Sequence, residues 1–256
     1  MDLQLVESIL PFVAVGFLAQ LVDGALGMAF GVITNTLLIS VLGVAPARAS
    51  ASVHIVECFT TAASGISHIA HGNVDWRLFG RLVVPGTIGG IAAAYLLSSI
   101  DAGVARPFVM AYLACIGVYL IWRAWEMGHH HVHKAPRYIA PLGMIGGFLD
   151  AAGGGGWGPV VTSNLLVQGS EPRRTIGTVN ASEFVLTLTI SATFLVALGA
   201  EAFTKATIGL IIGGLLAAPI GALLVKRVSA KWLLGMVGVV LVTTSVFSVT
   251  RVLMSG

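Results

Sequence analysis

Four carboxylates interrupt long apolar stretches of this sequence, at Asp23, Glu57, Asp150 and Glu183. If these stretches lie in a membrane, an ionisable side chain there is costly and commonly marks a substrate pathway, a proton relay or a partner for a cation. One hypothesis is therefore that these acids couple substrate movement to protons. The alternative is structural, because the two aspartates could cap half-length helices while the glutamates pair with backbone groups or arginines.

Two of these acids stand near the start of glycine-rich segments, VDGALGMAFG at 22–31 and FLDAAGGGGWGP at 148–159. Glycine lets the backbone adopt unusual dihedral angles and lets a ligand approach closely. A helix that begins at such a break presents free N–H groups and a partial positive charge. In lipid, unwound backbone is tolerated only where it lines a cavity or is buried in protein. The pattern predicts two helix breaks that cradle a small anion; the alternative is that the glycines only permit close helix packing.

Further candidates for binding an anion follow each break. Arg48 and Arg174 come directly after Pro-x pairs, and the planar guanidinium fork suits oxyanions, although an arginine at the membrane interface can also satisfy helix ends or lipid headgroups. Small polar side chains nearby could donate to a substrate or make interhelical hydrogen bonds, and the tryptophan could wall the cavity or pack. The candidate substrate-binding residues are Gly27, Asn35, Ser52, His54, Arg48, Gly154, Gly155, Trp157, Ser163, Arg174 and Asn180.

The composition shows which solvent surrounds these residues. The chain has 256 residues, of which 56% are hydrophobic and only 10% are charged, and its mean hydropathy is +0.93. A soluble domain carries about 25% charged residues, so this chain could not cover a water-facing surface. The sequence therefore predicts a multi-pass protein in the lipid bilayer. Its basic residues are spread over many loops, so no nucleic-acid partner is expected.

Apolar runs predict an all-α membrane protein with about ten segments. They fall at 9–22, 26–43, 49–71, 78–99, 104–124, 138–151, 155–168, 175–199, 205–225 and 231–254. The first, sixth and seventh runs are too short to cross a hydrocarbon core about 30 Å thick at about 1.5 Å per residue. Each pair that contains a short run is expected to form two half-length helices or a re-entrant hairpin.

The distribution of Lys and Arg predicts the orientation. Of the 14 basic residues, only Arg48, Arg106, Lys205 and Arg251 fall on one side of the ten-segment topology, and the rest fall on the other. Cytoplasmic loops are enriched in Lys and Arg. We therefore expect a protein of the cell (inner) membrane with both termini extracytoplasmic.

The two halves of the chain match in their rarer residues. Asp150 follows Asp23 by 127 positions, and Pro46, Arg48, His54 and Glu57 correspond to Pro172, Arg174, Asn180 and Glu183 at an offset of 126. A repeat of five segments must enter the membrane from the opposite face the second time, which gives the inverted repeat of many secondary transporters. We expect repeats at 1–125 and 138–256, each beginning with short broken or re-entrant helices.

A histidine-containing cytoplasmic linker at 126–137 joins the two repeats in this interpretation. Its tract GHHHVHKAP, at 128–136, could bind a transition metal, but no acidic or cysteine partners accompany it. A solvated linker is the favoured reading, and we expect no metal site and no cofactor.

The two glycine-rich segments, each followed by Pro-x-Arg and a Ser/Thr-rich segment with a glutamate, resemble the TauE/SafE family of sulfite and organosulfonate exporters. The resemblance covers essentially the whole chain. It implies a permease that moves small sulfur-containing anions, most often outward, without nucleotide hydrolysis. The first segment here has fewer glycines than the second, so the two cradles need not bind substrate alike.

We therefore predict a secondary transporter rather than an enzyme, with a small anionic substrate and the lipid bilayer as its partners. A membrane enzyme needs a nucleophile and base or a metal cluster, for which the intramembrane histidines are too few. A channel would show a continuous polar stripe and a selectivity ring. A cation or metal-ion carrier that uses Asp23 and Asp150 is the main alternative. Glycine-rich faces could pack within one monomer or between two, as a homodimer.

Overall fold

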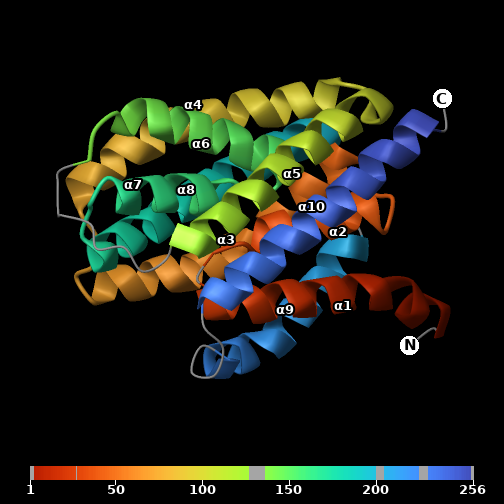
Figure 1. The fold of residues 1–256 in the computed structure, drawn as a ribbon, viewed down its shortest axis with the longest axis horizontal. Coiled ribbons are helices and arrows are strands. Elements are labelled where there is room, and N and C mark those ends of the chain that lie inside the picture. Colours follow the sequence, from red (N-terminus) through yellow and green to blue (C-terminus); the bar gives the residue numbers. More distant parts are fainter. Residues whose placement is uncertain (1–2, 27, 127–135, 200–204, 225–229, 255–256) are drawn as a thin grey trace.

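The computed structural model describes residues 3–26, 28–126, 136–199, 205–224 and 230–254, and within these ranges the chain is helical with no β-strand (Figure 1). The elements are α1 (Leu3–Leu26), α2 (Phe30–Ser40), α3 (Pro46–Ala70), α4 (Trp76–Ser99), α5 (Ala102–Glu126), α6 (Ile139–Gly153), the π-helix η1 (Trp157–Thr162), α7 (Ser163–Val167), α8 (Pro172–Leu198), α9 (Lys205–Leu224) and α10 (Ala230–Met254). The predicted all-α class is confirmed.

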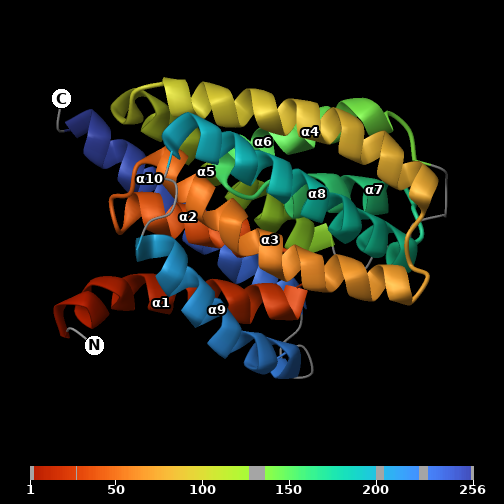
Figure 2. The same cartoon turned by 180° about the vertical axis from the view of Figure 1, so that it is seen from behind.

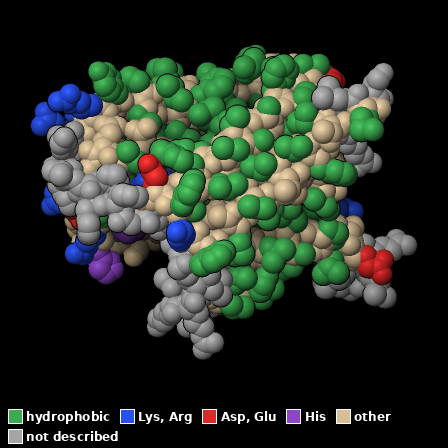
Figure 3. Space-filling view, viewed as in Figure 1, with side chains coloured by type: hydrophobic (Ala, Val, Ile, Leu, Met, Phe, Trp, Pro, Cys, Tyr) green, Lys and Arg blue, Asp and Glu red, His purple; other side chains and the backbone are tan. Residues whose placement is uncertain are grey.

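Lipid-compatible helices make up most of this bundle. Among the described residues, four helices are long and apolar enough to cross a membrane, namely α4, α5, α8 and the Lys231–Thr250 part of α10, and shorter apolar helices accompany them. Hydrophobic side chains cover much of the outer face in Figure 3, and Phe108, Leu215 and Trp232 are each more than two thirds exposed. Such a surface is stable only in lipid, which supports a multi-pass membrane protein.

Both predicted helix breaks are present. α1 ends at Leu26 and α2 begins at Phe30, while α6 ends at Gly153 and η1 begins at Trp157. The expectation that the first segment is short is wrong for α1, which has 24 residues and is about 36 Å long. It continues past Asp23 because that carboxylate bonds to the backbone of the next helix rather than ending its own.

Each pair of helices around a break turns back on itself. The Arg137 N–H, just before α6, donates to the Gln168 Oε1 atom just after α7, so this pair begins and ends at the same end of the molecule. The Arg106 guanidinium, near the start of α5, donates to the Gly43 carbonyl beyond α2 at 2.9 Å. Figures 1 and 2 show α1 beginning at that same end, where α10 finishes.

Helices of the first half pack mainly on helices of the second. α1 lies along α9, α4 along α6, α5 along α10, and α3 along α8. Glycines make these approaches close: an added Cβ would meet the Val13 carbonyl at Gly213 and backbone of Met144 at Gly89. The glycine-rich faces of α4 and α9 thus pack within the monomer, and a homodimer remains a prediction.

Basic residues gather at the end where α3 joins α4 and α7 joins α8, opposite the start of α1 (Figures 1 and 3). The residues of this end include Arg77, Arg81, Arg137, Arg173 and Arg174. The end that carries these basic residues is the one that the sequence predicts to be cytoplasmic, and the orientation itself stays a prediction. The histidine tract at 128–136 lies, except for Pro136, outside the described residues, and the proposed repeat boundaries are likewise predictions.

Candidate functional site

The two helix breaks cross in direct contact at the centre of the molecule. Gly155 has a φ of 147°, a conformation that favours glycine. A Cβ on Gly31 would collide with the Gly154 carbonyl, and a Cβ on Gly155 would collide with the Val32 amide nitrogen. Only glycine at both positions lets the backbones approach this closely, so the glycines serve the crossing itself.

An aspartate bridges each break in the same way. The Phe30 N–H donates to Asp23 Oδ1 at 3.1 Å, and the Trp157 N–H donates to Asp150 Oδ1 at 2.9 Å. The Gly156 N–H donates to the same Asp150 oxygen at 2.6 Å. In both breaks the acceptor precedes the donor helix by seven residues. Each carboxylate therefore satisfies first-turn amides that have no intrahelical partner and faces the positive end of a helix dipole.

The second break is sealed by a histidine from α3. His54 Nε2 lies 3.2 Å from Asp150 Oδ2, and its Nδ1 lies 2.8 Å from the Ser50 carbonyl. Their side chains are 0% and 1% exposed. The carbonyl can only accept, so Nδ1 carries a proton, and the contact to Asp150 needs one more proton on either atom. The pair is fully enclosed.

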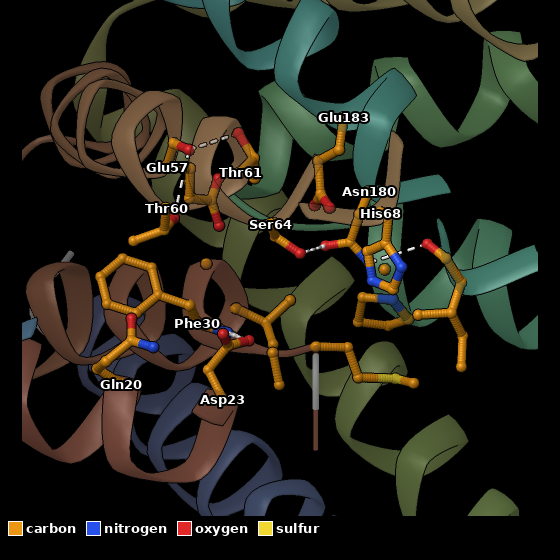
Figure 4. A pocket seen from close by; sticks show the side chains of 18 residues that line it. Gln20, Asp23, Phe30, Glu57, Thr60, Thr61, Ser64, His68, Asn180 and Glu183 are labelled. Atoms are coloured by element: carbon orange, nitrogen blue, oxygen red, sulfur yellow. Dashed lines mark hydrogen bonds between the residues drawn. The ribbon is translucent and has the colours of Figure 1, made fainter. Parts of the chain in front are cut away.

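Asp23 at the first break, by contrast, borders a cavity of about 270 Å³ between α1, α2, α3, η1 and α8, which Gly155 of the second break also lines. Figure 4 shows Asp23 on one side of it and Glu57 and Glu183 on the other. No Lys or Arg is among its described lining residues. Its polar lining consists of Gln20, Asp23, Glu57, Thr60, Thr61, Ser64, His68, Asn180 and Glu183.

Some polar atoms of this cavity lack a protein partner. Glu57 is 6% exposed and Gln20 is 8% exposed, yet Glu57 Oε2 and Gln20 Oε1 accept no hydrogen bond from the described residues. A buried polar atom without a partner is costly. These two oxygens therefore point to a polar ligand, a bound proton or water in the cavity.

Hydrogen-bond donors also reach the cavity. Residues 29–32, at the start of α2, line it, and the first-turn amides and dipole of a helix favour negative charge. The Ser64 hydroxyl donates to Asn180 Oδ1 at 3.1 Å, and Asn180 Nδ2 donates to the Ile176 carbonyl at 3.0 Å. The cavity thus combines a positive helix end, hydroxyl groups and three carboxyls that can hold protons.

The structure separates the predicted site residues into three groups. Asp23, Glu57, Gly155, Asn180 and Glu183 line the cavity. Others are buried beside the breaks but do not line it, namely Asn35, Ser52, His54, Asp150, Gly154, Trp157 and Ser163. Arg48 and Arg174 are exposed and do not line it. Gly27 lies outside the described residues. Their roles remain predictions.

Two of the buried residues hold the breaks in place. Asn35 Nδ2 donates to the Gly153 carbonyl and so ties α2 to the second break. Trp157 Nε1 donates to the Val179 carbonyl at 3.2 Å, and its ring is completely buried. Both side chains join the breaks to neighbouring helices. For Trp157 this agrees with the alternative that its ring packs rather than walls the cavity.

Several lining residues escaped the sequence analysis. Thr60, Thr61, Ser64 and His68 follow Glu57 at three, four, seven and eleven positions, which is the spacing of one helix face. That stripe is the signal that could have found them. Gln20 likewise precedes Asp23 by one turn, on the same helix.

A helical bundle in lipid that encloses a polar cavity at two broken helices has the architecture of a membrane transporter. The family model described as Sulfite exporter TauE/SafE matches residues 12–248. The Probable membrane transporter protein YtnM of Bacillus subtilis (strain 168) is 44% identical over 228 residues, which cover 86% of this chain and 76% of that protein. No solved structure matches.

The chain therefore belongs to the sulfite exporter TauE/SafE family, and the resemblance seen in its motifs is confirmed. It is a membrane transporter rather than an enzyme, as the family and the relative both indicate.

Proposed function

We propose that this protein is a secondary transporter that exports small sulfur-containing oxyanions, such as sulfite or organosulfonates, with coupling to protons. The observation that carries the proposal is the cavity at the first break, where the start of α2 faces Asp23, Glu57 and Glu183 without a Lys or Arg in the described lining. The family description supports the choice of substrate.

The carboxyls explain how substrate and proton would be linked. Ionised, they would repel an oxyanion in a site of low dielectric constant. Protonated, each becomes an O–H donor that adds to the α2 amides and the cavity hydroxyls. Anion and protons would then occupy the cavity together. The combined gradients set the direction of net flux, and export requires a high internal concentration of the anion.

An inverted repeat of α1–α5 and α6–α10 is part of the proposal. In this repeat α1 corresponds to α6, and α4 corresponds to α9. The packing of α1 on α9 is therefore equivalent to the packing of α6 on α4. The remaining corresponding helices pack directly on each other, α3 on α8 and α5 on α10. This reciprocity and the two aspartate bridges support an approximate two-fold relation. The sealed second break would be the counterpart of the open first one, and the two would exchange roles during transport in the cell membrane, with both termini outside.

The proposal is tested by flux in proteoliposomes. Vesicles loaded with radiolabelled sulfite should lose it with saturable kinetics, unlabelled external sulfite should accelerate this exchange, and an imposed pH gradient should change the rate. Protein-free vesicles give the background. Folded, reconstituted protein that moves neither sulfite nor a small sulfonate contradicts the proposal, and flux that shows no exchange acceleration indicates an anion channel.

The acidic lining also favours a second candidate, a carrier of cations or metal ions. Three carboxylates suit a cation when ionised, although no group of three His, Cys, Asp or Glu residues in the described part of the chain is arranged to hold a metal ion. Asp150, part of the predicted aspartate pair, lies with His54 instead. The same vesicles, assayed with a panel of divalent cations, would show metal flux without sulfite flux if this candidate is correct.

A further inference from the structure

A second polar cavity, of about 240 Å³, lies at the basic end of the molecule. It shares no lining residue with the cavity at the first break. The starts of α4, α6 and α8 surround it, and three of its lining residues are Arg77, Arg81 and Arg174. Figure 3 shows Lys and Arg side chains gathered at this end.

These three guanidinium groups have no hydrogen bond or ion pair with any residue that the structure describes. The nearby carboxylates are engaged elsewhere: Asp75 Oδ1 accepts from the Arg77 and Leu78 amides at 2.9 and 3.0 Å. Glu171 accepts from the Arg173 and Arg174 amides at 3.0 and 2.8 Å. The cavity therefore keeps a surplus of unpaired arginine donors.

Further donors open on the same cavity. Ser170 lines it, and its buried hydroxyl has no partner among the described residues. α6 begins at Ile139, another lining residue, and its N-cap Tyr138 offers no side-chain cap. Arg77 and Arg81 are one turn apart on α4, and Arg174 approaches from α8. Such an arrangement suits the several oxygens of a phosphate group, which arginine forks bind in pairs.

Aromatic residues beside the cavity indicate its depth in the membrane. Trp76 is 60% exposed and Tyr138 is 80% exposed, and they adjoin Arg77 and Ile139 in the chain. Exposed Trp and Tyr are enriched at the level of lipid headgroups. Basic pockets between membrane helices commonly hold anionic headgroups. We propose that Arg77, Arg81 and Arg174 form a binding site for the phosphate of an anionic membrane phospholipid.

Native mass spectrometry of the detergent-purified protein tests this site. Phosphatidylglycerol should remain bound to the wild type, and Arg174→Gln should weaken its affinity by about tenfold or more, because a charge-assisted hydrogen bond to the phosphate is lost. The triple variant R77Q/R81Q/R174Q should lose binding altogether. Arg173→Gln is the matched control, because it removes the same charge from the neighbouring position, which does not line the cavity.

Four outcomes decide the proposal. If inorganic phosphate at millimolar concentration displaces the lipid, the site binds phosphate but its ligand is a free anion. If the lipid is retained, the result supports a phospholipid headgroup as the ligand. Equal loss in Arg173→Gln and Arg174→Gln would overturn the site in favour of nonspecific charge. So would unchanged binding in the triple variant, provided that thermal unfolding shows all variants to be folded. Binding is measured without flux, so the result is independent of the transport proposal.

Discussion

The two helix breaks of this protein use the same backbone design and differ in what faces it. In both, an aspartate accepts an N–H from the helix seven residues ahead. At the second break the facing residue is His54, which contacts Asp150 and encloses it. At the first break the corresponding residue in the proposed repeat is Asn180, which bonds to its own helix and to Ser64. Asp23 is left facing a cavity.

This difference teaches that a matched pair of sequence motifs does not make a matched pair of sites. The carboxylate bridge is common to both breaks. The side chain that faces each aspartate differs, and for Asp150 it is His54, on a different helix and more than ninety residues away in the chain. The predictions that follow alter one break at a time, or transfer a feature from one break to the other.

The largest effect on transport is expected where the breaks touch. Gly31→Ala places a methyl group on the Gly154 carbonyl and beside Glu57, so the crossing must separate. We expect loss of transport and destabilisation of about 1–3 kcal/mol, measured by flux and by thermal unfolding in detergent. Gly80→Ala is the control, because a Cβ there meets nothing within 4 Å. Equal behaviour of the two variants would show that the crossing is loose.

The next effect compares the two bridging aspartates. Asp150→Ala removes the partner of His54 together with the acceptor of the Gly156 and Trp157 amides, and breaking a buried pair costs about 3–5 kcal/mol. Asp23→Ala removes only the acceptor of the Phe30 amide, so its loss of stability should be about 1 kcal/mol. Thermal unfolding of both variants measures the difference. A larger loss for Asp23→Ala would contradict the assignment of the sealed break.

Exchange of the facing residues tests whether they control access. Asn180→His brings an imidazole to the wall of the cavity, where it can approach Asp23 and fill space, so we expect transport to fall by about tenfold, an effect of about 1.4 kcal/mol. His54→Asn should instead mainly lower stability, because it leaves Asp150 Oδ2 without its partner. Flux and unfolding are measured for both. Unchanged flux in folded Asn180→His would refute the role of this position.

The smallest change in rate is expected for the cavity glutamate, and its signature is pH dependence. Protonated carboxyls would admit the anion, so wild-type binding should strengthen as pH falls. Glu57→Gln imitates the protonated side chain permanently at one of the three carboxyls, so binding should weaken less as pH rises and flux should respond less to a pH gradient. Glu126→Gln, outside the cavity, is the control. A Glu57→Gln variant that still responds fully to the gradient would remove Glu57 from coupling.

The sequence by itself determined the helical membrane class, the positions of both breaks and the acids beside them. These follow from local properties: apolar runs require backbone hydrogen bonds within the segment, and glycines with an aspartate interrupt them at 22–31 and 148–159. The local pattern gives the wrong length for α1. The charged residues Glu7 and Asp23 limit the apolar run in the sequence, but the helix continues through both.

Tertiary structure alone decided which break is open. The pairing of His54 with Asp150, the packing of α1 on α9, and the gathering of Gln20, Glu57 and Glu183 around one cavity join residues from distant segments. Helical periodicity tells which face of a segment is polar but not which other helix it meets, because that depends on the close packing of all the helices at once. Hence the polar stripe of α3 can be predicted from the sequence, whereas the cavity that it lines cannot.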